Sequence, residues 1–181
     1  MLITDENIYL KTLSQNDIGI NYVNWMNDYQ VVKYTESKFT THTLDSIKQF
    51  VETCNNSKNN FLFGIFLKDN DLHVGNIKLG NIHNLYNHGD IGLIIGLKEY
   101  WGKGIATKAI KMVTDYGFDT LNLHKIFAGA YSMNVGSIKA FQKCGYNIAY
   151  IKKDEVFFEN NYVDCVWLEK FNHRHTLEQN D

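Results

Sequence analysis

Proline is absent from this chain of 181 residues, and cysteine is scarce. The three cysteines, Cys54, Cys144 and Cys165, are an odd number and form no CxxC pair, and no Cys/His cluster has the spacing of metal ligands. The sequence therefore predicts neither a disulfide framework nor a zinc site. We expect reduced thiols and no bound metal, and the lack of proline supports no functional prediction.

Long apolar runs and an excess of charge of one sign are also missing. No run approaches the roughly 18 apolar residues that a membrane-spanning helix needs, and residues 1–13 lack the charged and apolar regions of a signal peptide. The net charge of −2, with scattered Lys and Arg, provides no basic stripe for nucleic acid. These absences predict a cytoplasmic protein that has neither a membrane nor a nucleic acid as partner.

The composition itself is typical of one folded domain, with 44% hydrophobic and 14% aromatic residues. A chain of this length can bury most of its apolar surface without disulfides or metals. We expect one domain over residues 1–172, followed by a polar C-terminal tail over residues 173–181.

The hydrophobic periodicity predicts a mixture of strands and helices without a βα repeat. Strands are expected at residues 8–13, 61–67, 73–79, 90–97, 125–131, 146–158 and 163–171. Helices are expected at residues 17–27, 44–55, 102–120 and 135–143. This order predicts the α+β class, with a mixed, mostly antiparallel sheet of about seven strands flanked by about four helices.

The most informative segment is the glycine-rich start of the third expected helix, at Gly102 and Gly104. A glycine-rich turn before a helix leaves several backbone N–H groups free at the positive end of the helix dipole, where they can hold a pyrophosphate. Neither the GxxxxGK[ST] nor the GxGxxG pattern is met, because position 107 is Thr. Taken alone, the motif also fits an ordinary tight turn that leads into a helix.

Three linked blocks give this segment a context: residues 100–107 (YWGKGIAT), residues 121–126 (LNLHKI), and residues 134–141 (NVGSIKAF) with Cys144-Gly145-Tyr146. In order and spacing they resemble the GNAT superfamily of N-acetyltransferases, closest to the branch that acetylates ribosomal-protein N-termini. A looser likeness extends over residues 8–168. The resemblance implies a GNAT-like fold and acetyl-CoA as the acetyl donor.

The resemblance also implies where acetyl-CoA binds. Gly102, Lys103, Gly104 and Ala106 would direct backbone N–H groups to the pyrophosphate, with Thr107 just inside the helix. Trp101 stands where the wider superfamily has Gln or Arg, so we expect the backbone contact to survive and any side-chain hydrogen bond to be lost.

In the same family the strand at Leu93-Ile94-Ile95 separates from the next strand, and its free backbone groups bind the pantetheine arm and polarise the thioester carbonyl. Asn134 and Ser137 would line the opposite wall. Phe141 also belongs to the expected cofactor site, although it stands where many members carry a Tyr that protonates the departing thiolate.

Direct transfer to a primary amine in a ternary complex requires an acid and a base. For the acid, Ser137 is the candidate by position, and a structural role in the first turn of its helix is an equal alternative. Candidate bases are the carboxylates that the family places near the acceptor, with Glu36 and Asp154 preferred. The remaining candidates are Asp90, Glu155, His83, His88 and His124.

Two other readings stay open. The chain could be a non-catalytic or sensor module of the same fold that binds acetyl-CoA, or an acyl hydrolase that uses Cys144 as nucleophile. For an N-acetyltransferase, the partner would be an amine-bearing small molecule, such as an amino sugar, a polyamine or an aminoglycoside, or a protein N-terminus. Residues 33–43 and 81–89 are expected to shape the acceptor site, and a homodimer is left open.

Overall fold

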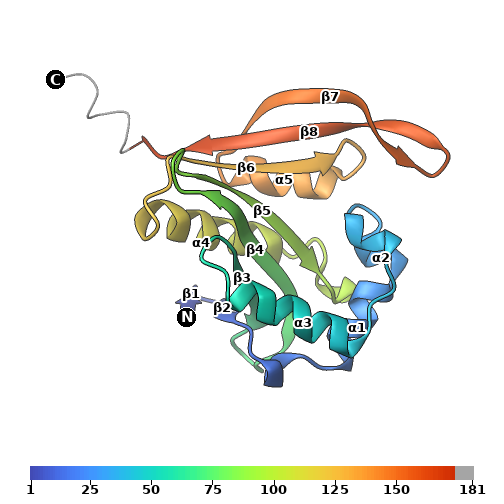
Figure 1. Ribbon diagram of the computed structural model, residues 1–181, viewed down its shortest axis with the longest axis vertical. Coiled ribbons are helices and arrows are strands. Elements are labelled where there is room, and N and C mark those ends of the chain that lie inside the picture. Colours follow the sequence, from blue (N-terminus) through green and yellow to red (C-terminus); the bar gives the residue numbers. More distant parts are fainter. Residues whose placement is uncertain (174–181) are drawn as a thin grey trace.

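The computed structural model describes residues 1–173, so positions 174–181 of the expected tail lie outside the described residues. The described chain forms one sheet of eight strands in the order β1-β2-β3-β4-β5-β6-β8-β7 (Figure 1). The strands are β1 Leu2–Thr4, β2 Ile8–Thr12, β3 Phe61–Leu67, β4 His73–His83, β5 His88–Ile95, β6 Lys125–Tyr131, β7 Asn147–Phe158 and β8 Asn161–Phe171. The helices are α1 Ile20–Asn27, α2 Tyr29–Val32, α3 Leu44–Asn55, α4 Ile105–Asp119 and α5 Val135–Lys143, with short 3₁₀ turns η1 Gln15–Asp17, η2 Glu36–Phe39 and η3 Lys98–Tyr100.

Neighbouring strands in this sheet pair antiparallel, except for β5 and β6, which run parallel. A parallel pair needs a crossover connection, and here α4 supplies it. The crossover therefore brings the glycine-rich helix start beside the end of β5.

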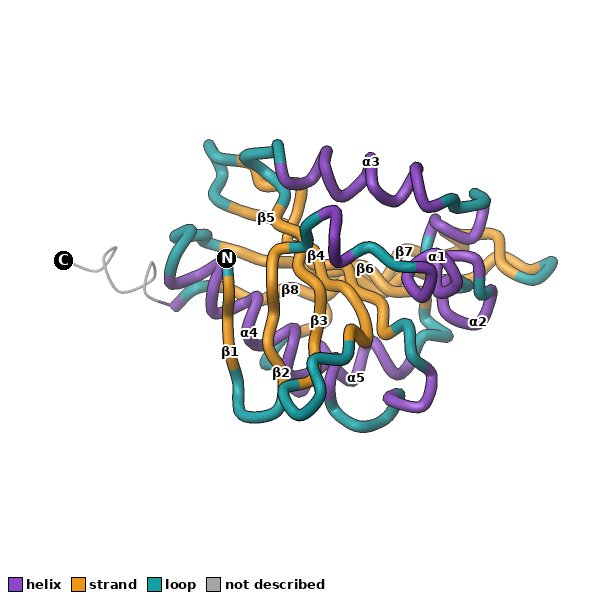
Figure 2. The backbone as a smooth tube through the Cα atoms, turned by 90° about the horizontal axis from the view of Figure 1, so that it is seen from below, coloured by secondary structure: helices purple, strands orange, loops and turns teal. Residues whose placement is uncertain are grey.

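Helices cover the two faces of the sheet unequally. Figure 2 shows α3 on one side of the sheet and α4 with α5 on the other. The buried residues of α4 include Ala109, Ile110 and Val113, whose spacing of three to four residues places them on one face against the main core. A second cluster, which includes Trp25, Ile47 and Val51, packs beneath α1 and α3 over the N-terminal half of the sheet. The strands β6, β8 and β7 have no helix on that side (Figure 1).

The predicted α+β class and mostly antiparallel sheet are confirmed, with one more strand and one more helix than expected. The bounds predicted for α3, β3, β6 and α5 agree with those in the structure. The first long helix begins at Ile20 rather than at Asp17, because Asp17 closes the turn η1. Its carboxylate accepts hydrogen bonds from the Ser14 N–H (2.8 Å) and hydroxyl (2.7 Å). The sequence pattern missed β1 and α2, which have only three and four residues.

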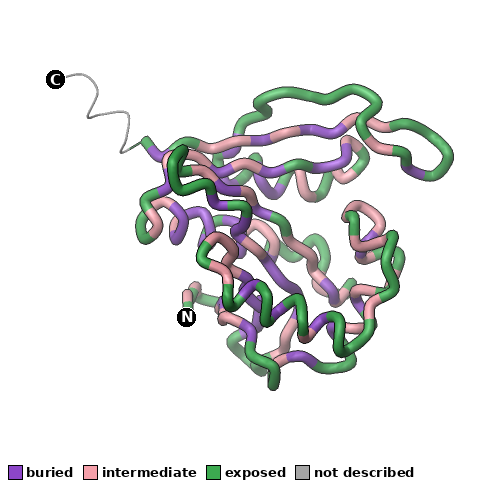
Figure 3. The backbone as a smooth tube through the Cα atoms, in the orientation of Figure 1, coloured by how far each residue is buried: buried purple, intermediate pink, exposed green. Residues whose placement is uncertain are grey.

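The long β7–β8 hairpin forms the exposed edge of the sheet. Figure 3 shows β7 exposed along nearly its whole length. The tip of the hairpin leans toward α2, where the Tyr29 hydroxyl donates a hydrogen bond to Glu159 Oε1 (3.1 Å). The segment between α1 and α3 therefore meets the hairpin near the C-terminal ends of β5 and β6.

Candidate active site

The two parallel strands separate partway along their length. The pairing of β5 with β6 ends where Asp90 lies opposite Phe127, although β5 continues to Ile95 and β6 to Tyr131. Figure 1 shows the strands diverging toward α2. On its other side β5 remains paired with β4 as far as Ile95. The predicted separation at Leu93, Ile94 and Ile95 is therefore present in the described chain, and it frees one backbone edge of β5.

Two glycines leave space beside this separation. Gly92 on β5 has open space where a side chain would stand. Gly129 on β6 pairs with Trp167 on β8, and a Cβ on Gly129 would lie 3.5 Å from the Trp167 ring. Because residues that alternate along a strand share a face, both glycines face the side of the sheet opposite α4 and α5. This bare backbone leaves room for a substrate on that side.

The start of α4 has the form expected for an anion site. Gly104 is the N-cap, in the left-handed region at φ 79°, and Gly102 adopts φ 73°. No side chain caps the helix, and nothing lies within 4 Å of where a Cβ on either glycine would stand. The first N–H groups of a helix lack intrahelical partners, so those of Ile105, Ala106 and Thr107 are available to an anion. These residues fit the pyrophosphate of acetyl-CoA.

Trp101 differs from expectation in one respect. Its indole N–H donates a hydrogen bond to the main-chain oxygen of Ile95 (2.7 Å), so a side-chain hydrogen bond exists, directed to this chain itself. The bond ties the glycine-rich loop to the end of β5, while 44% of the Trp101 side chain stays exposed. Lys103 places its ammonium 4.9 Å from the centre of the Tyr100 ring. The side chains of Trp101 and Lys103 thus pack against other parts of the loop, and the N-terminus of α4 stays open.

The start of α5 provides the opposite side of the separation. Asn134 is the N-cap, and its side chain accepts a hydrogen bond from the Ser137 N–H (3.3 Å). The Asn134 side-chain oxygen therefore has a structural task. Ser137 is half-buried, and its hydroxyl makes no hydrogen bond within the described chain. That hydroxyl is free to meet a ligand.

Phe141 and Cys144 point into the core instead. Phe141 is 1% exposed, and its ring packs edge-on against Tyr146 at 5.1 Å. Cys144 is buried, and its thiol donates to the main-chain oxygen of Thr107 (3.1 Å). Burial raises the pKa of this thiol, which favours the unreactive protonated form. The geometry gives the Cys144 nucleophile no support.

Glu36, in η2, lies beside the C-terminal end of β6, where the two strands are apart. It is exposed, and one carboxylate oxygen accepts a hydrogen bond from the Tyr131 hydroxyl (2.9 Å) at the end of β6. Burial, together with this bond, raises the pKa of Tyr131 well above its usual range, so the phenol keeps its proton. Lys38 also reaches the Tyr131 oxygen (2.9 Å). Sequence reasoning included Lys38 in the range 33–43 but missed Tyr131 and the contact between them, because 93 positions separate the two and no local motif joins them.

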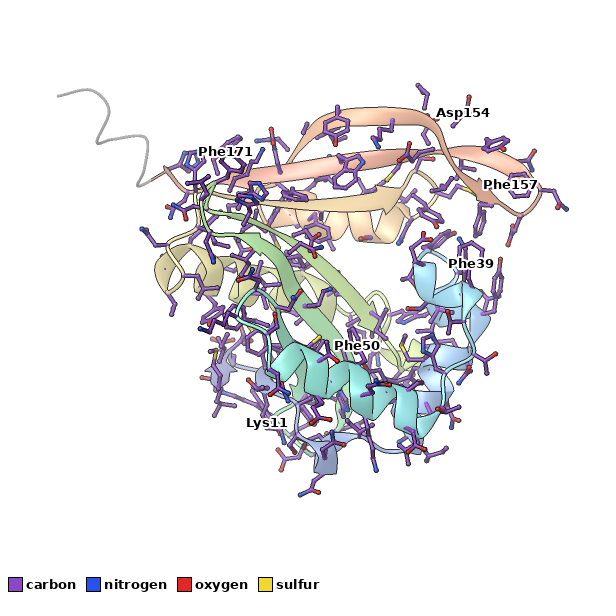
Figure 4. The ribbon with its side chains drawn as sticks, viewed as in Figure 1. Lys11, Phe39, Phe50, Asp154, Phe157 and Phe171 are labelled. Carbon is purple, nitrogen blue, oxygen red and sulfur yellow. The ribbon has the colours of Figure 1, made fainter. Side chains whose placement is uncertain are left out.

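The other candidate bases are spread over the sheet. Asp154 lies exposed on the bulged edge strand β7, where its N–H donates to Asp164 Oδ1 (3.1 Å), and it points away from the molecule (Figure 4). Asp90 accepts a hydrogen bond from Asn81 (2.7 Å), and Glu155 forms an ion pair with Lys152 (2.8 Å). Asp154 thus faces solvent rather than the space between β5 and β6.

A row of aromatic side chains crosses the face of the sheet opposite α4 and α5, from the β4–β5 turn to β7. Neighbouring rings lie 4.4–5.9 Å apart, and the outer pairs are stacked. The buried nitrogens His88 Nδ1 and Trp167 Nε1 have no hydrogen-bond partner within the described residues. We define the row, in spatial order, as Tyr86, His83, His88, Phe127, Trp167 and Tyr150. The predicted loop histidines His83 and His88 thus end β4 and begin β5, whereas His124, just before β6, packs edge-on against Phe171 at 5.5 Å.

Residues 1–173 lack two features that would have pointed to other functions. They contain no group of three or more His, Cys, Asp or Glu residues placed to hold a metal ion. In the same range, no helix combines the length and the apolar character needed to span a bilayer.

Known proteins resemble this chain over most of its length. The acetyltransferase (GNAT) domain family matches residues 7–147. Spermidine N(1)-acetyltransferase of Escherichia coli K12 is 26% identical over 172 residues, which are 94% of this chain and 83% of that protein. An uncharacterised N-acetyltransferase of Bacillus licheniformis is 30% identical over 148 residues, covering 77% of this chain and 82% of that protein.

Solved structures share the fold at low sequence identity. Spermidine N-acetyltransferase from Vibrio cholerae, solved in complex with CoA and spermine, superposes with a TM-score of 0.83 at 21% identity, covering 95% of this chain and 99% of that one. A putative ribosomal-protein-serine acetyltransferase from Vibrio cholerae has a TM-score of 0.74 at 16% identity, covering 94% and 97% of the two chains.

Proposed function

Because the chain belongs to the GNAT acetyltransferase family and its cosubstrate is acetyl-CoA, we propose that it acetylates a primary amine on a small molecule by direct attack. The observation that carries this proposal is the pairing of an uncapped, glycine-opened α4 with a β5 edge that β6 leaves free. Together they offer backbone N–H groups to a pyrophosphate and to a carbonyl that gains negative charge.

Acetyl-CoA supplies a thioester carbonyl, to which the acceptor nitrogen forms a C–N bond while the C–S bond breaks. Glu36 takes the proton that the amine loses, and Tyr131 holds the Glu36 carboxylate in place through its 2.9 Å hydrogen bond. The Ser137 hydroxyl donates a hydrogen bond to the departing sulfur, which then takes up a proton from solvent as coenzyme A leaves. With Phe141 buried, Ser137 takes the task that a Tyr performs in many family members.

For the acceptor we propose an amine carried on a sugar ring. The aromatic row lies on the same face as Gly92 and Gly129 and ends in two exposed rings, Tyr86 and Tyr150. Flat side chains of this kind give a ring-shaped ligand a large contact area, and the few polar groups among them fix its orientation. A polyamine is the second candidate, because the relatives named above include spermidine acetyltransferases.

The test is release of coenzyme A with a panel of acceptors: glucosamine, spermidine, and a short peptide with a free N-terminus. We expect turnover with at least one amine, and a Glu36→Gln variant should lower kcat by about 100-fold or more. Undiminished turnover in Glu36→Gln would remove Glu36 from the mechanism. Acetyl-CoA binding by calorimetry without turnover of any amine would instead favour the sensor module.

A further inference from the structure

The ammonium of Lys38 lies in a cage of aromatic rings on the acceptor side of the site. Its Nζ atom is 4.5 Å from the centre of the Tyr131 ring, 5.3 Å from that of Phe158 and 4.8 Å from that of Phe39. Tyr34 completes the wall, with ring centres 5.5 Å from Phe158 and 6.1 Å from Tyr131. Ring faces at these distances attract cations.

A carboxylate completes the chemistry of this cage. Lys38 donates to the Tyr131 hydroxyl oxygen (2.9 Å), and the same hydroxyl donates to Glu36 (2.9 Å). Aromatic faces together with one carboxylate are the groups that recognise alkylammonium ligands. In this protein the chain's own lysine fills the place that such a ligand would take.

The cage also lies on the same side of the sheet as the space beside Gly92 and Gly129. Tyr131 ends β6 and, by strand alternation, faces the same side as Gly129 and the aromatic row. The β7–β8 hairpin and η2 supply the other walls through Phe158 and Phe39. An acceptor with a second ammonium group would have to displace Lys38 or lie beside its charge.

We propose that Lys38 is a specificity-determining residue that occupies this cation site and so disfavours polyamines against acceptors with a single amine. The inference rests on the proposed function as an N-acetyltransferase. It names a feature of the acceptor: one amine, without a second positive charge within reach of η2. Discrimination of this kind works by repelling the wrong ligand rather than by adding contacts to the right one.

Three variants test the role of Lys38. Lys38→Met empties the cage of charge while it keeps a long apolar side chain. Lys38→Arg keeps the charge. Lys33→Met removes a neighbouring lysine whose ammonium lies 5.1 Å over the Tyr34 ring and donates to Gln30 (3.2 Å) rather than to Tyr131. Circular dichroism and thermal unfolding establish that each variant is folded, and Lys38→Gln replaces Lys38→Met if the latter is not.

Two readouts are measured for each variant. Calorimetry with spermidine, without acetyl-CoA, reports binding to the cage, and coenzyme A release gives the ratio of kcat/KM for spermidine to that for glucosamine. We expect Lys38→Met to tighten spermidine binding and to raise the ratio at least tenfold, whereas Lys38→Arg and Lys33→Met stay near wild type. Unchanged spermidine binding in folded Lys38→Met, or an equal gain in Lys33→Met, overturns the proposal. Tighter binding without any turnover would support the cage and refute only the acetyltransferase assignment.

Discussion

Replacing Gly104 by Val should have two effects: it strains the backbone at the start of α4, and it obstructs the proposed pyrophosphate site there. Gly104 adopts φ 79° and ψ 0°, a conformation that costs a residue with a Cβ about 1–2 kcal/mol. For a domain of this size that loss lowers the unfolding midpoint by about 2–8 °C. The added side chain would project into space that is empty in the structure and that the pyrophosphate needs.

The substitution should also weaken acetyl-CoA binding, which backbone strain by itself would not do. A hydrogen bond to a charged group contributes about 1.5–3 kcal/mol, so displacing the pyrophosphate from one N–H group weakens binding by roughly tenfold or more. Isothermal titration calorimetry with acetyl-CoA measures this directly.

Gly145 offers a matched control, since it adopts φ 82° after α5 and a Cβ there meets only Lys170 atoms at 3.5 and 3.6 Å. Gly145→Val should lose similar stability and keep its affinity for acetyl-CoA. Equal affinity in Gly104→Val and wild type would refute the pyrophosphate cradle.

Three further variants test separate parts of the reasoning. Ser137→Ala should lower kcat at least tenfold with little change in the Kd of acetyl-CoA, and a wild-type kcat would return the hydroxyl to a structural role. Cys144→Ala should keep turnover but reduce the free energy of unfolding by about 1–2 kcal/mol, because the thiol packs in the core; loss of turnover would revive the thioester route. Burial lowers the pKa of His73 in the folded chain. Below about pH 6.5 the unfolded chain therefore binds a proton at His73 more readily than the folded chain does, and the free energy of unfolding should fall as the pH falls. His73→Gln should flatten that slope in urea unfolding measured from pH 7.5 to 5, and an unchanged slope would contradict the assignment to His73.

Local patterns were sufficient to predict α3 and the glycine-rich turn before α4. The capping residue Thr43 accepts a hydrogen bond from the Ser46 N–H (3.1 Å), which starts α3 where the sequence places it. Likewise Gly102 and Gly104 adopt positive φ angles, which their residue type favours and the pyrophosphate loop requires. These features depend on neighbours within a few residues, so they can be read from sequence.

The proposed acceptor side depends on contacts between residues far apart in the chain, so most of these contacts could not be predicted from the sequence. Glu36 was anticipated from family resemblance, but its partner Tyr131 lies 95 positions away. The resemblance also implies Asp154 as a base near the acceptor. A bulge between Lys152 and Val156 interrupts the register of β7, however, and the Asp154 side chain is exposed. A register shift of this kind reverses which face a side chain occupies, and no alternation pattern revealed it.

On the proposed function, the two substrates bind to separate elements of the fold. The cofactor side consists of β5 and α4, whose shape depends on main-chain geometry and two glycines, so it is insensitive to most side-chain changes. The acceptor side is formed by η2, the end of β6 and the hairpin tip, where charged and aromatic side chains make the contacts. Substitutions in η2 should therefore change which amine is acetylated while the Kd of acetyl-CoA stays constant, because Glu36 and Lys38 make their long-range contacts with Tyr131 and Phe158.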